Sequence, residues 1–312
     1  MSFKKILITG TGGFVGMNLI PTLLKYYEVD GIDLHDKYNV CLNNFFTWSD
    51  LEKLDEYEIV IHLAGIAHDT SNSTESKIYY DVNLGLTKKI FDYFLKSDSE
   101  KFIFFSSVKA VSDSVNDNIL TEDDAPGPKT PYGQSKLAAE QYILDQKLPP
   151  GKKVYILRPC MIHGPGNKGN LNLLYNIVKK GIPYPLGAFH NLRSFTSIEN
   201  MIFIIREFIE KDIEPGIYQV ADDEPISTNE IVELIASTLN KNLRIWKIPK
   251  RLIRTIAKTG DWIYFPLNSE RLKKLTESYV VSNSKLKSAF GIKNLPVSVR
   301  NGLKYTFESF EK

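Results

Sequence analysis

The stretch of residues 4–16 restricts what this chain can fold into more than any other part of it. Residues 4–9 form a short apolar run rich in β-branched side chains, which is typical of a strand buried on both faces of a parallel sheet. A glycine turn and an apolar pattern of helical period follow. Strand, glycine turn and helix in this order form a cradle for the pyrophosphate of a dinucleotide, whereas a glycine triplet alone would indicate an ordinary tight turn. The predicted contacts are Gly10, Gly13, Phe14, Val15 and Gly16.

Composition limits the class of protein. The chain has 312 residues, 43% of them hydrophobic, so it can bury a large core as one or two domains. Its 39 basic and 37 acidic residues leave a net charge of +2, which gives no general attraction to nucleic acid. No apolar run reaches about 18 residues, so we expect no stable membrane insertion, and the early strand leaves no room for a signal peptide. Cys41 and Cys160 show neither metal nor disulfide spacing, so we expect a cytoplasmic protein without a metal.

A carboxylate follows the second predicted strand, which spans residues 27–33. Asp33 lies 20 residues after Gly13, the distance at which an acid meets the adenosine ribose in a dinucleotide fold. A carboxylate there accepts hydrogen bonds from the ribose hydroxyls and repels a 2′-phosphate, so Asp33 favours NAD, without excluding NADP; a solvated turn acid is the alternative. Asp50 and Leu51 could meet the adenine, although a helix N-cap explains Asp50 equally well.

Strands and helices alternate through the first half of the chain. Buried strands are expected at 58–63, 101–107 and 153–157, and helices at 78–96 and from Pro131, with Thr130 as N-cap. This alternation predicts an α/β fold with a doubly wound parallel sheet. We expect residues 1–160 to form the dinucleotide-binding Rossmann domain, with 191–221 returning to it. Residues 161–190 and 222–312 are expected to form a smaller, mostly helical substrate-binding lobe.

Three side chains could carry the chemistry. Tyr132 and Lys136 are four residues apart on one helix and share a face, and Ser107 ends a predicted strand. A phenol with a pKa near 10 is a poor base at neutral pH, but a nearby ammonium and an oxidised nicotinamide can lower that pKa. Tyr132 could then take a hydroxyl proton while Ser107 binds the same substrate oxygen. The alternative is a surface Tyr–Lys pair, which is common on any helix.

These motifs together resemble the extended short-chain dehydrogenase/reductase family, in its nucleotide-sugar epimerase/dehydratase branch, of which UDP-glucose 4-epimerase is typical. They are the glycine stretch 9–16, Asp33, His62-Leu63-Ala64-Gly65, Ser106-Ser107 and Tyr132-Gly-Gln-Ser-Lys136. The resemblance spans essentially the whole chain and implies bound NAD, a Ser/Tyr/Lys catalytic set and a lobe that grips a nucleoside diphosphate-sugar.

The resemblance also implies roles for single residues. Leu63, Ala64, Gly65 and Asn83 would lie along the cofactor, with Asn83 near the catalytic centre. Arg193 would pair with the diphosphate, although Ser194 replaces the Asp usual after that arginine, and Arg271 would be a second contact. Asn170, Asn172 and Leu186 fall where the family contacts phosphate, ribose and base.

The neighbours of Ser107 narrow the reaction. The dehydratases of the family have Thr-Asp-Glu where this chain has Ser107-Val108-Lys109, so both carboxylates needed to eliminate water are missing. Two reactions on a UDP- or dTDP-sugar remain: C4 epimerisation through NAD, and one-way reduction of a 4-keto sugar by NAD(P)H. The motifs are similar to those of enzymes that make surface-polysaccharide precursors. A non-catalytic dinucleotide-binding regulator is a third reading, but such proteins usually lose the tyrosine or lysine.

The same family pairs two helices of each chain into a four-helix dimer interface. The equivalent helices here are 78–96 and 131–145, and they carry apolar residues such as Phe91, Tyr142 and Ile143. We therefore expect a homodimer. The alternative is that these residues only pack on their own sheet.

Overall fold

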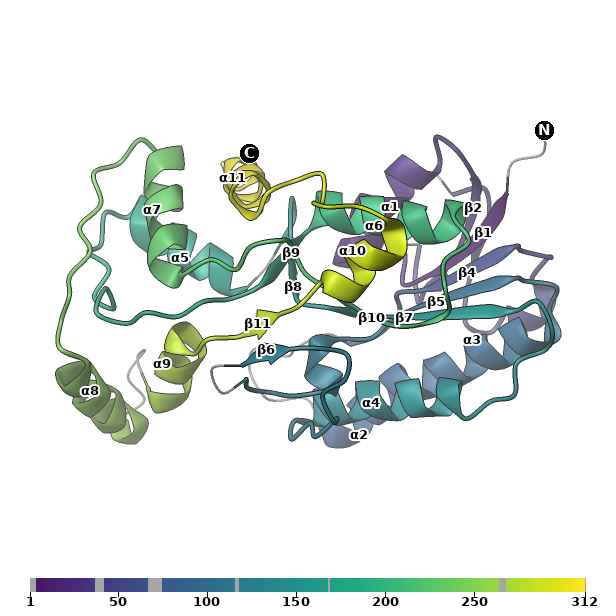
Figure 1. Cartoon of the computed structure of the whole chain (residues 1–312), viewed down its shortest axis with the longest axis horizontal. Helices are drawn as coiled ribbons and strands as arrows, with labels where there is room; N and C mark the ends of the chain where they lie inside the picture. Colours follow the sequence, from purple (N-terminus) through teal and green to yellow (C-terminus); the bar gives the residue numbers. More distant parts are fainter. Residues whose placement is uncertain are drawn as a thin grey trace.

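A seven-stranded parallel sheet forms one end of the molecule (Figure 1). The structure is a computed structural model, and it describes residues 4–36, 42–66, 75–115, 118–167, 169–263 and 268–311. The strand order is β10-β7-β5-β4-β1-β2-β3. The strands are β1 (Lys5–Thr9), β2 (Glu28–Ile32), β3 (Phe45–Phe46), β4 (Ile59–His62), β5 (Lys101–Phe105), β7 (Lys153–Pro159) and β10 (Gly216–Val220). The order reverses beside β1, which is the point where open parallel sheets bind ligands. The predicted doubly wound fold is confirmed.

Helices cover both faces of this sheet because its strands are apolar on both sides. In β1, Ile6 and Ile8 face one buried cluster and Leu7 faces the other, and all three side chains are fully buried. The first cluster is closed by α1 (Phe14–Leu23) and α6 (Ile198–Glu210), and the second by α3 (Gly85–Lys96) and α4 (Pro131–Leu144). As predicted, Thr130 caps α4 with its side chain, which accepts a hydrogen bond from the Gly133 backbone.

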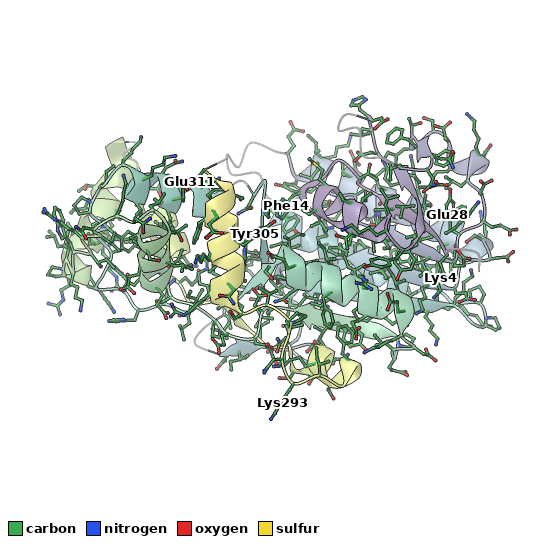
Figure 2. All side chains as sticks on the ribbon, turned by 90° about the horizontal axis from the view of Figure 1, so that it is seen from above. Lys4, Phe14, Glu28, Lys293, Tyr305 and Glu311 are labelled. Atoms are coloured by element: carbon green, nitrogen blue, oxygen red, sulfur yellow. The ribbon has the colours of Figure 1, made fainter. Side chains whose placement is uncertain are left out.

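The other end of the molecule is a smaller, mostly helical lobe with its own apolar core. Its helices are α5 (Asn170–Lys179), α7 (Thr228–Thr238), α8 (Lys250–Ile263), α9 (Ser269–Thr276) and α11 (Val299–Ser309). Figure 2 shows α11, which carries Tyr305, between the lobe and the sheet layer that holds Phe14. By contrast, α10 (Ser284–Phe290) packs with Leu286 and Phe290 on the core of the sheet. The domain boundaries drawn from the sequence stay a prediction.

Two short parallel pairs that the sequence did not predict join the lobe to the sheet. They are β8 (Met161–His163) with β9 (Phe195–Ser197), and β6 (Ile119–Leu120) with β11 (Val280–Val281). The segment before α4 was expected to be a surface loop, yet it also contains the 3₁₀ turn η3 (Val108–Ala110). Paired strands of two or three residues lack the length that makes a strand visible in a sequence.

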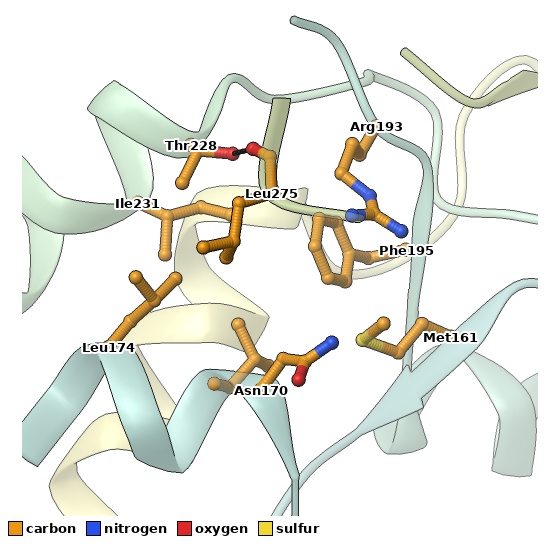
Figure 3. Close-up of a pocket in the computed structure, with 9 residues that line it drawn as sticks. Met161, Asn170, Leu174, Arg193, Phe195, Thr228, Ile231 and Leu275 are labelled. Carbon is orange, nitrogen blue, oxygen red and sulfur yellow. Dashed lines mark hydrogen bonds between the residues drawn. The ribbon is translucent and has the colours of Figure 1, made fainter. Parts of the chain in front are cut away.

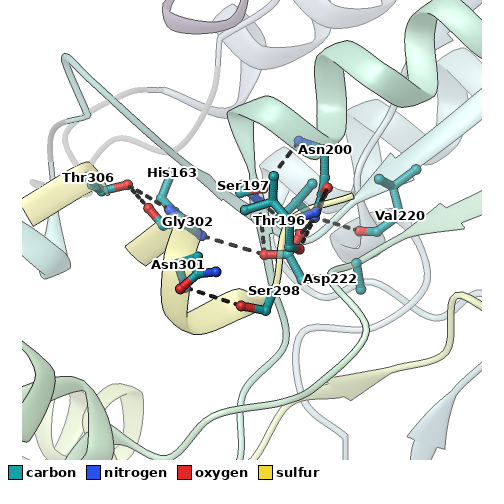
Figure 4. A network of polar contacts seen from close by, with 12 residues as sticks. His163, Thr196, Ser197, Asn200, Val220, Asp222, Ser298, Asn301, Gly302 and Thr306 are labelled. Carbon is teal, nitrogen blue, oxygen red and sulfur yellow. Dashed lines mark hydrogen bonds and ion pairs between the residues drawn. The ribbon is translucent and has the colours of Figure 1, made fainter. Parts of the chain in front are cut away.

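A buried polar network fixes α11 against β8 and β9 (Figure 4). His163 Nδ1 lies 2.8 Å from Thr306 Oγ1, and His163 Nε2 lies 3.7 Å from Asp222 Oδ2. The Asp222 carboxylate accepts hydrogen bonds from the Ser197 backbone at 3.0 and 3.1 Å. A Cβ added to Gly302 would lie 2.7 Å from Ser197 Cβ, so only glycine allows α11 to approach this closely. The network thereby sets the position of the lobe relative to the sheet.

The helix expected at 78–96 is interrupted in the structure. It consists of α2 (Ser76–Tyr79), a π-helical turn η2 (Tyr80–Leu84) and α3. Phe91 and Ile143 are both buried in the core beneath the sheet, so they pack on their own sheet and give no support to a dimer interface. The homodimer itself stays a prediction. No helix in the part of the chain that the structure describes is long and apolar enough to span a membrane.

Candidate active site

The glycine turn after β1 has the backbone that a dinucleotide cradle requires. Gly10 has a φ of +77°, and a Cβ there would lie 2.6 Å from the Ala64 backbone nitrogen. A Cβ on Gly16 would lie 2.6 Å from the Gly10 carbonyl oxygen, so both positions exclude a side chain. Gly13 precedes α1, whose first N–H groups, on Phe14 and Val15, have no partner within the helix. This donor set fits a dinucleotide pyrophosphate.

Asp33 lies next to this turn. It directly follows β2, and its Oδ2 accepts a hydrogen bond of 2.8 Å from the Gly12 backbone. Its Oδ1 accepts a second hydrogen bond, of 2.7 Å, from the Leu34 backbone. The carboxylate therefore holds the glycine turn, and its contact with the adenosine ribose stays a prediction.

Asp50 makes hydrogen bonds within its own turn. Its Oδ2 accepts hydrogen bonds from the Thr47 backbone at 3.0 Å and the Thr47 hydroxyl at 2.6 Å, and its Oδ1 pairs with Lys53 at 2.7 Å. These contacts hold the pKa of Asp50 well below its usual range, with the Lys53 hydrogen bond as the main cause. Asp50 precedes the 3₁₀ turn η1 (Leu51–Lys53) without capping it by a side-chain hydrogen bond. Adenine contacts of Asp50 and Leu51 stay predictions.

The end of β4 meets the π-helical turn through Asn83. Asn83 is fully buried; its Oδ1 accepts a hydrogen bond of 2.8 Å from the Ile66 backbone, and its Nδ2 donates one of 2.9 Å to Ser135 Oγ on α4. A Cβ on Gly65 would lie 2.9 Å from Asn83 Oδ1 and 3.0 Å from Lys136 Nζ. Gly65 thus leaves room for the side chains of the site, and the neighbouring Leu63 and Ala64 line the same strand end. The contacts of these residues with a cofactor stay predictions.

The three residues expected to do chemistry lie together at the start of α4. Ser107 lies two residues after the end of β5, and its side chain accepts a hydrogen bond of 3.2 Å from the Lys109 backbone. Burial raises the pKa of Tyr132 above its usual value of 10, and a hydrogen bond with Ser107 opposes that rise. Lys136 Nζ donates a 2.8 Å hydrogen bond to the Phe105 carbonyl, and burial lowers its pKa to about 8. A serine and a phenol in contact, with a buried ammonium one turn away, form an acid–base arrangement.

A buried ion pair beneath this site was missed from the sequence. Arg158 donates to Glu140 through Nε at 2.9 Å and through a second guanidinium nitrogen at 2.6 Å, and Ser106 also donates to Glu140. Both charged side chains are at most 3% exposed. Glu140 is four residues after Lys136 on α4, and its charge opposes the lowering of the Lys136 pKa. The spacing of Lys136 and Glu140 was the available signal, but it does not identify Arg158 as a partner.

A pocket lies in the lobe, and two of the predicted substrate residues line it (Figure 3). Arg193 and Asn170 line it together with apolar side chains of α5, β9 and α7, and burial lowers the pKa of Arg193. Ser194, the departure from the family pattern, accepts a hydrogen bond of 3.0 Å from the Val281 backbone and so supports β11. The pocket thus combines a guanidinium with an apolar wall.

The remaining predicted substrate residues lie elsewhere. Leu186 is only 3% exposed and packs inside the core of the lobe. Asn172 is half-buried on α5, and its Oδ1 has no hydrogen-bond partner among the described residues. Arg271 belongs to α9, but its side chain lies outside what the structure describes. Their contacts with a substrate stay predictions. Within the described ranges, no group of three or more His, Cys, Asp or Glu residues could hold a metal.

Known proteins are similar to this chain in sequence. A UDP-glucose 4-epimerase of Vibrio cholerae is 30% identical, and the match covers 98% of this chain and 95% of that protein. An Escherichia coli O157:H7 enzyme named N-acetyl-α-D-glucosaminyl-diphospho-ditrans,octacis-undecaprenol 4-epimerase is 26% identical, over 90% of this chain and 84% of the relative.

Solved structures give the same picture of the fold. A UDP-glucose 4-epimerase of Thermotoga maritima, solved with UDP-glucose, superposes with a TM-score of 0.77 at 21% identity, covering 98% of both chains. The Bordetella bronchiseptica enzyme WbmG, solved with NAD, has a TM-score of 0.77 at 19% identity over 99% of this chain and 94% of that one. Residues 6–221 match the model of the NAD dependent epimerase/dehydratase family. The chain is therefore an enzyme of the NAD-dependent epimerase/dehydratase family.

Proposed function

We propose that this enzyme epimerises C4 of a UDP-sugar, with a dTDP-sugar as the alternative nucleotide. The observation that carries the proposal is the grouping of Ser107, Tyr132 and Lys136 near the end of β5. An acid–base set at this place serves a hydroxyl or carbonyl carbon beside the nicotinamide. The V. cholerae relative, which this chain matches over nearly its whole length, is named for the same reaction.

Tyr132, Ser107 and Lys136 have different roles in this reaction. When bound, NAD supplies the acceptor and the donor of a hydride. Tyr132 takes the proton of the sugar hydroxyl and returns it, and Ser107 donates a hydrogen bond to the same oxygen. Burial raises the pKa of Tyr132, so its function as a base requires the positive charge of Lys136 to stabilise the phenolate. A Lys136→Ala variant should therefore lose rate, and it should also weaken NAD binding, because the lysine of this family reaches the nicotinamide ribose.

The pocket around Arg193 supports a diphosphate-linked substrate. A guanidinium offers paired N–H donors that match phosphate oxygens, and the apolar wall fits the flat face of a base. Dehydration has no support, because Val108 and Lys109 stand where the dehydratases of the family carry their acid and base.

A panel of UDP- and dTDP-sugars, with their 4-keto forms, tests the proposal. Purified enzyme with NAD should convert one or more sugars to the C4 epimer without net change in NADH absorbance. Steady loss of NADH or NADPH with a 4-keto sugar would replace the epimerase by the reductase. Dinucleotide binding without turnover of any sugar in the panel would replace it by a non-catalytic regulator.

A further inference from the structure

One surface of the lobe has a charge unlike that of the rest of the chain. Residues 241–258 contain seven basic side chains and no Asp or Glu: Lys241, Arg244, Lys247, Lys250, Arg251, Arg254 and Lys258. The whole chain has a net charge of +2, so the part outside this segment carries −5. The basic excess of the protein is therefore concentrated in one segment, which consists of residues 250–258 of α8 and the stretch before them; Asp261 lies further along α8.

These cations are accessible, and apolar side chains lie among them. All seven are exposed, and none takes part in an ion pair found among the described residues. In the same segment Trp246 is 51% exposed, Leu252 53% and Ile256 38%. We call the seven cations and these three apolar side chains the α8 surface.

The fold holds α8 by its inner face only. Ile253 and Ala257 are buried in the core of the lobe, and α8 packs on α9. Figure 1 shows α8 at the end of the molecule that lies farthest from the sheet. The α8 surface therefore projects away from the catalytic site and is available to a large, flat partner.

The two kinds of side chain form separate rows on the helix. Leu252 and Ile256 are four residues apart and share a row on one flank of the exposed side of α8, and Arg254 and Lys258 share a row on the opposite flank. A partner must accept apolar groups and also supply negative charge. Phosphates of a nucleic acid would satisfy the cations but leave the apolar row in water, whereas an anionic bilayer satisfies both.

We propose that the α8 surface docks this enzyme on an anionic lipid bilayer, with α8 lying in the plane of the headgroups. Charge complementarity carries the proposal, together with the exposed Trp246, a residue type that favours the interface between water and lipid. A helix of 14 residues with this many charges is suited to lie on a bilayer and too short to span one. The inference goes beyond the proposed reaction and does not depend on it.

Co-sedimentation of the full chain with lipid vesicles tests the proposal. The wild type should bind phosphatidylcholine vesicles that contain phosphatidylglycerol, should not bind pure phosphatidylcholine, and should be released by salt. Changing Arg251→Gln, Arg254→Gln and Lys258→Gln together should lower partitioning about 100-fold. Changing Leu252→Ser and Ile256→Ser together should lower it at least about tenfold.

A matched control removes the same charge elsewhere. Lys25, Lys147 and Lys293 are exposed on other elements, so changing all three to Gln should leave vesicle binding unchanged. Circular dichroism confirms that each variant is folded. The proposal is overturned if the wild type ignores anionic vesicles, or if the control loses binding as the α8 variant does. A nucleic-acid surface would replace it if two results occur together. The wild type would bind duplex DNA more tightly than vesicles, and the Leu252/Ile256 variant would bind DNA and vesicles as tightly as the wild type.

Discussion

Burial of Lys136 as a cation lowers the free energy of unfolding of the protein. The pKa of Lys136 is about 8 in the folded protein, against 10.5 as its ordinary value, with burial as the main cause. Between these two values the unfolded chain binds more protons than the folded one, so the free energy of unfolding rises with pH in that window. The destabilisation is fully present below pH 8 and is relieved as the pH approaches 10.5.

A Lys136→Met variant isolates this effect. Between about pH 7 and about pH 9.5, we expect the free energy of unfolding of the wild type to rise by about 2 kcal/mol relative to that of the variant. Urea denaturation of both proteins at the two pH values measures the difference. Parallel changes in the two proteins would show that Lys136 is not buried as a cation.

Asp33 is expected to set the choice of cofactor. Its carboxylate accepts hydrogen bonds from Gly12 and Leu34, so it is fixed beside the glycine turn, and a 2′-phosphate there would meet a like charge. We predict that the wild type binds NAD(H) about ten to a hundred times more tightly than NADP(H). Asp33→Ser should relax that preference, and Asp33→Ala should weaken NAD binding. Dissociation constants for both dinucleotides on the three proteins provide the test, and tighter NADP(H) binding by the wild type would favour the reductase.

At the scale of elements, the Glu140–Arg158 pair ties α4 to β7 beneath the catalytic residues. Arg158→Leu or Glu140→Leu alone leaves a buried charge without its partner, so each should lower the free energy of unfolding by about 3–5 kcal/mol. The double variant should lose much less than the sum of the two losses. Urea denaturation of the four proteins measures the coupling, and additive losses would refute it. Lys304→Leu, in the exposed pair with Glu308, is the control and should change stability little.

The sequence predicted elements best where one local signal decides. The glycine turn and β1 were recognised because a buried strand and a phosphate-binding turn each have a characteristic pattern. The π-helical turn at Asn83 was not recognised, because the apolar pattern of residues 78–96 is that of an ordinary α-helix. A π-helical turn is set by packing against the rest of the fold and leaves no mark in the sequence pattern. Arg158 was likewise missed because its partner lies on another element. The burial of Leu186 in the core of the lobe was not foreseen either, because a single leucine in a turn carries no local signal of burial.

At the scale of the whole molecule, a homodimer remains the expectation. Phe91 and Ile143 are used within the chain, but Ile78 and Leu144 on the same pair of helical segments are 43% and 56% exposed. Light scattering at micromolar concentration should give twice the 35.5 kDa mass of one chain. Ile78→Glu with Leu144→Glu should give monomers, whereas Leu173→Glu, at an equally exposed site on α5, should not. A monomeric wild type would count against the prediction.

The central claim is that Tyr132 removes and returns a proton while C4 of a nucleotide-sugar exchanges a hydride within the site. Proton NMR of a UDP-sugar that carries deuterium at C4, incubated with the enzyme and NAD, tests it most directly. We predict that the C4 epimer forms with its deuterium retained, and that Tyr132→Phe lowers this rate by about 10²–10⁴-fold while NAD binding stays nearly unchanged. Formation of the epimer with loss of deuterium, or a Tyr132→Phe variant as fast as the wild type, would contradict the mechanism.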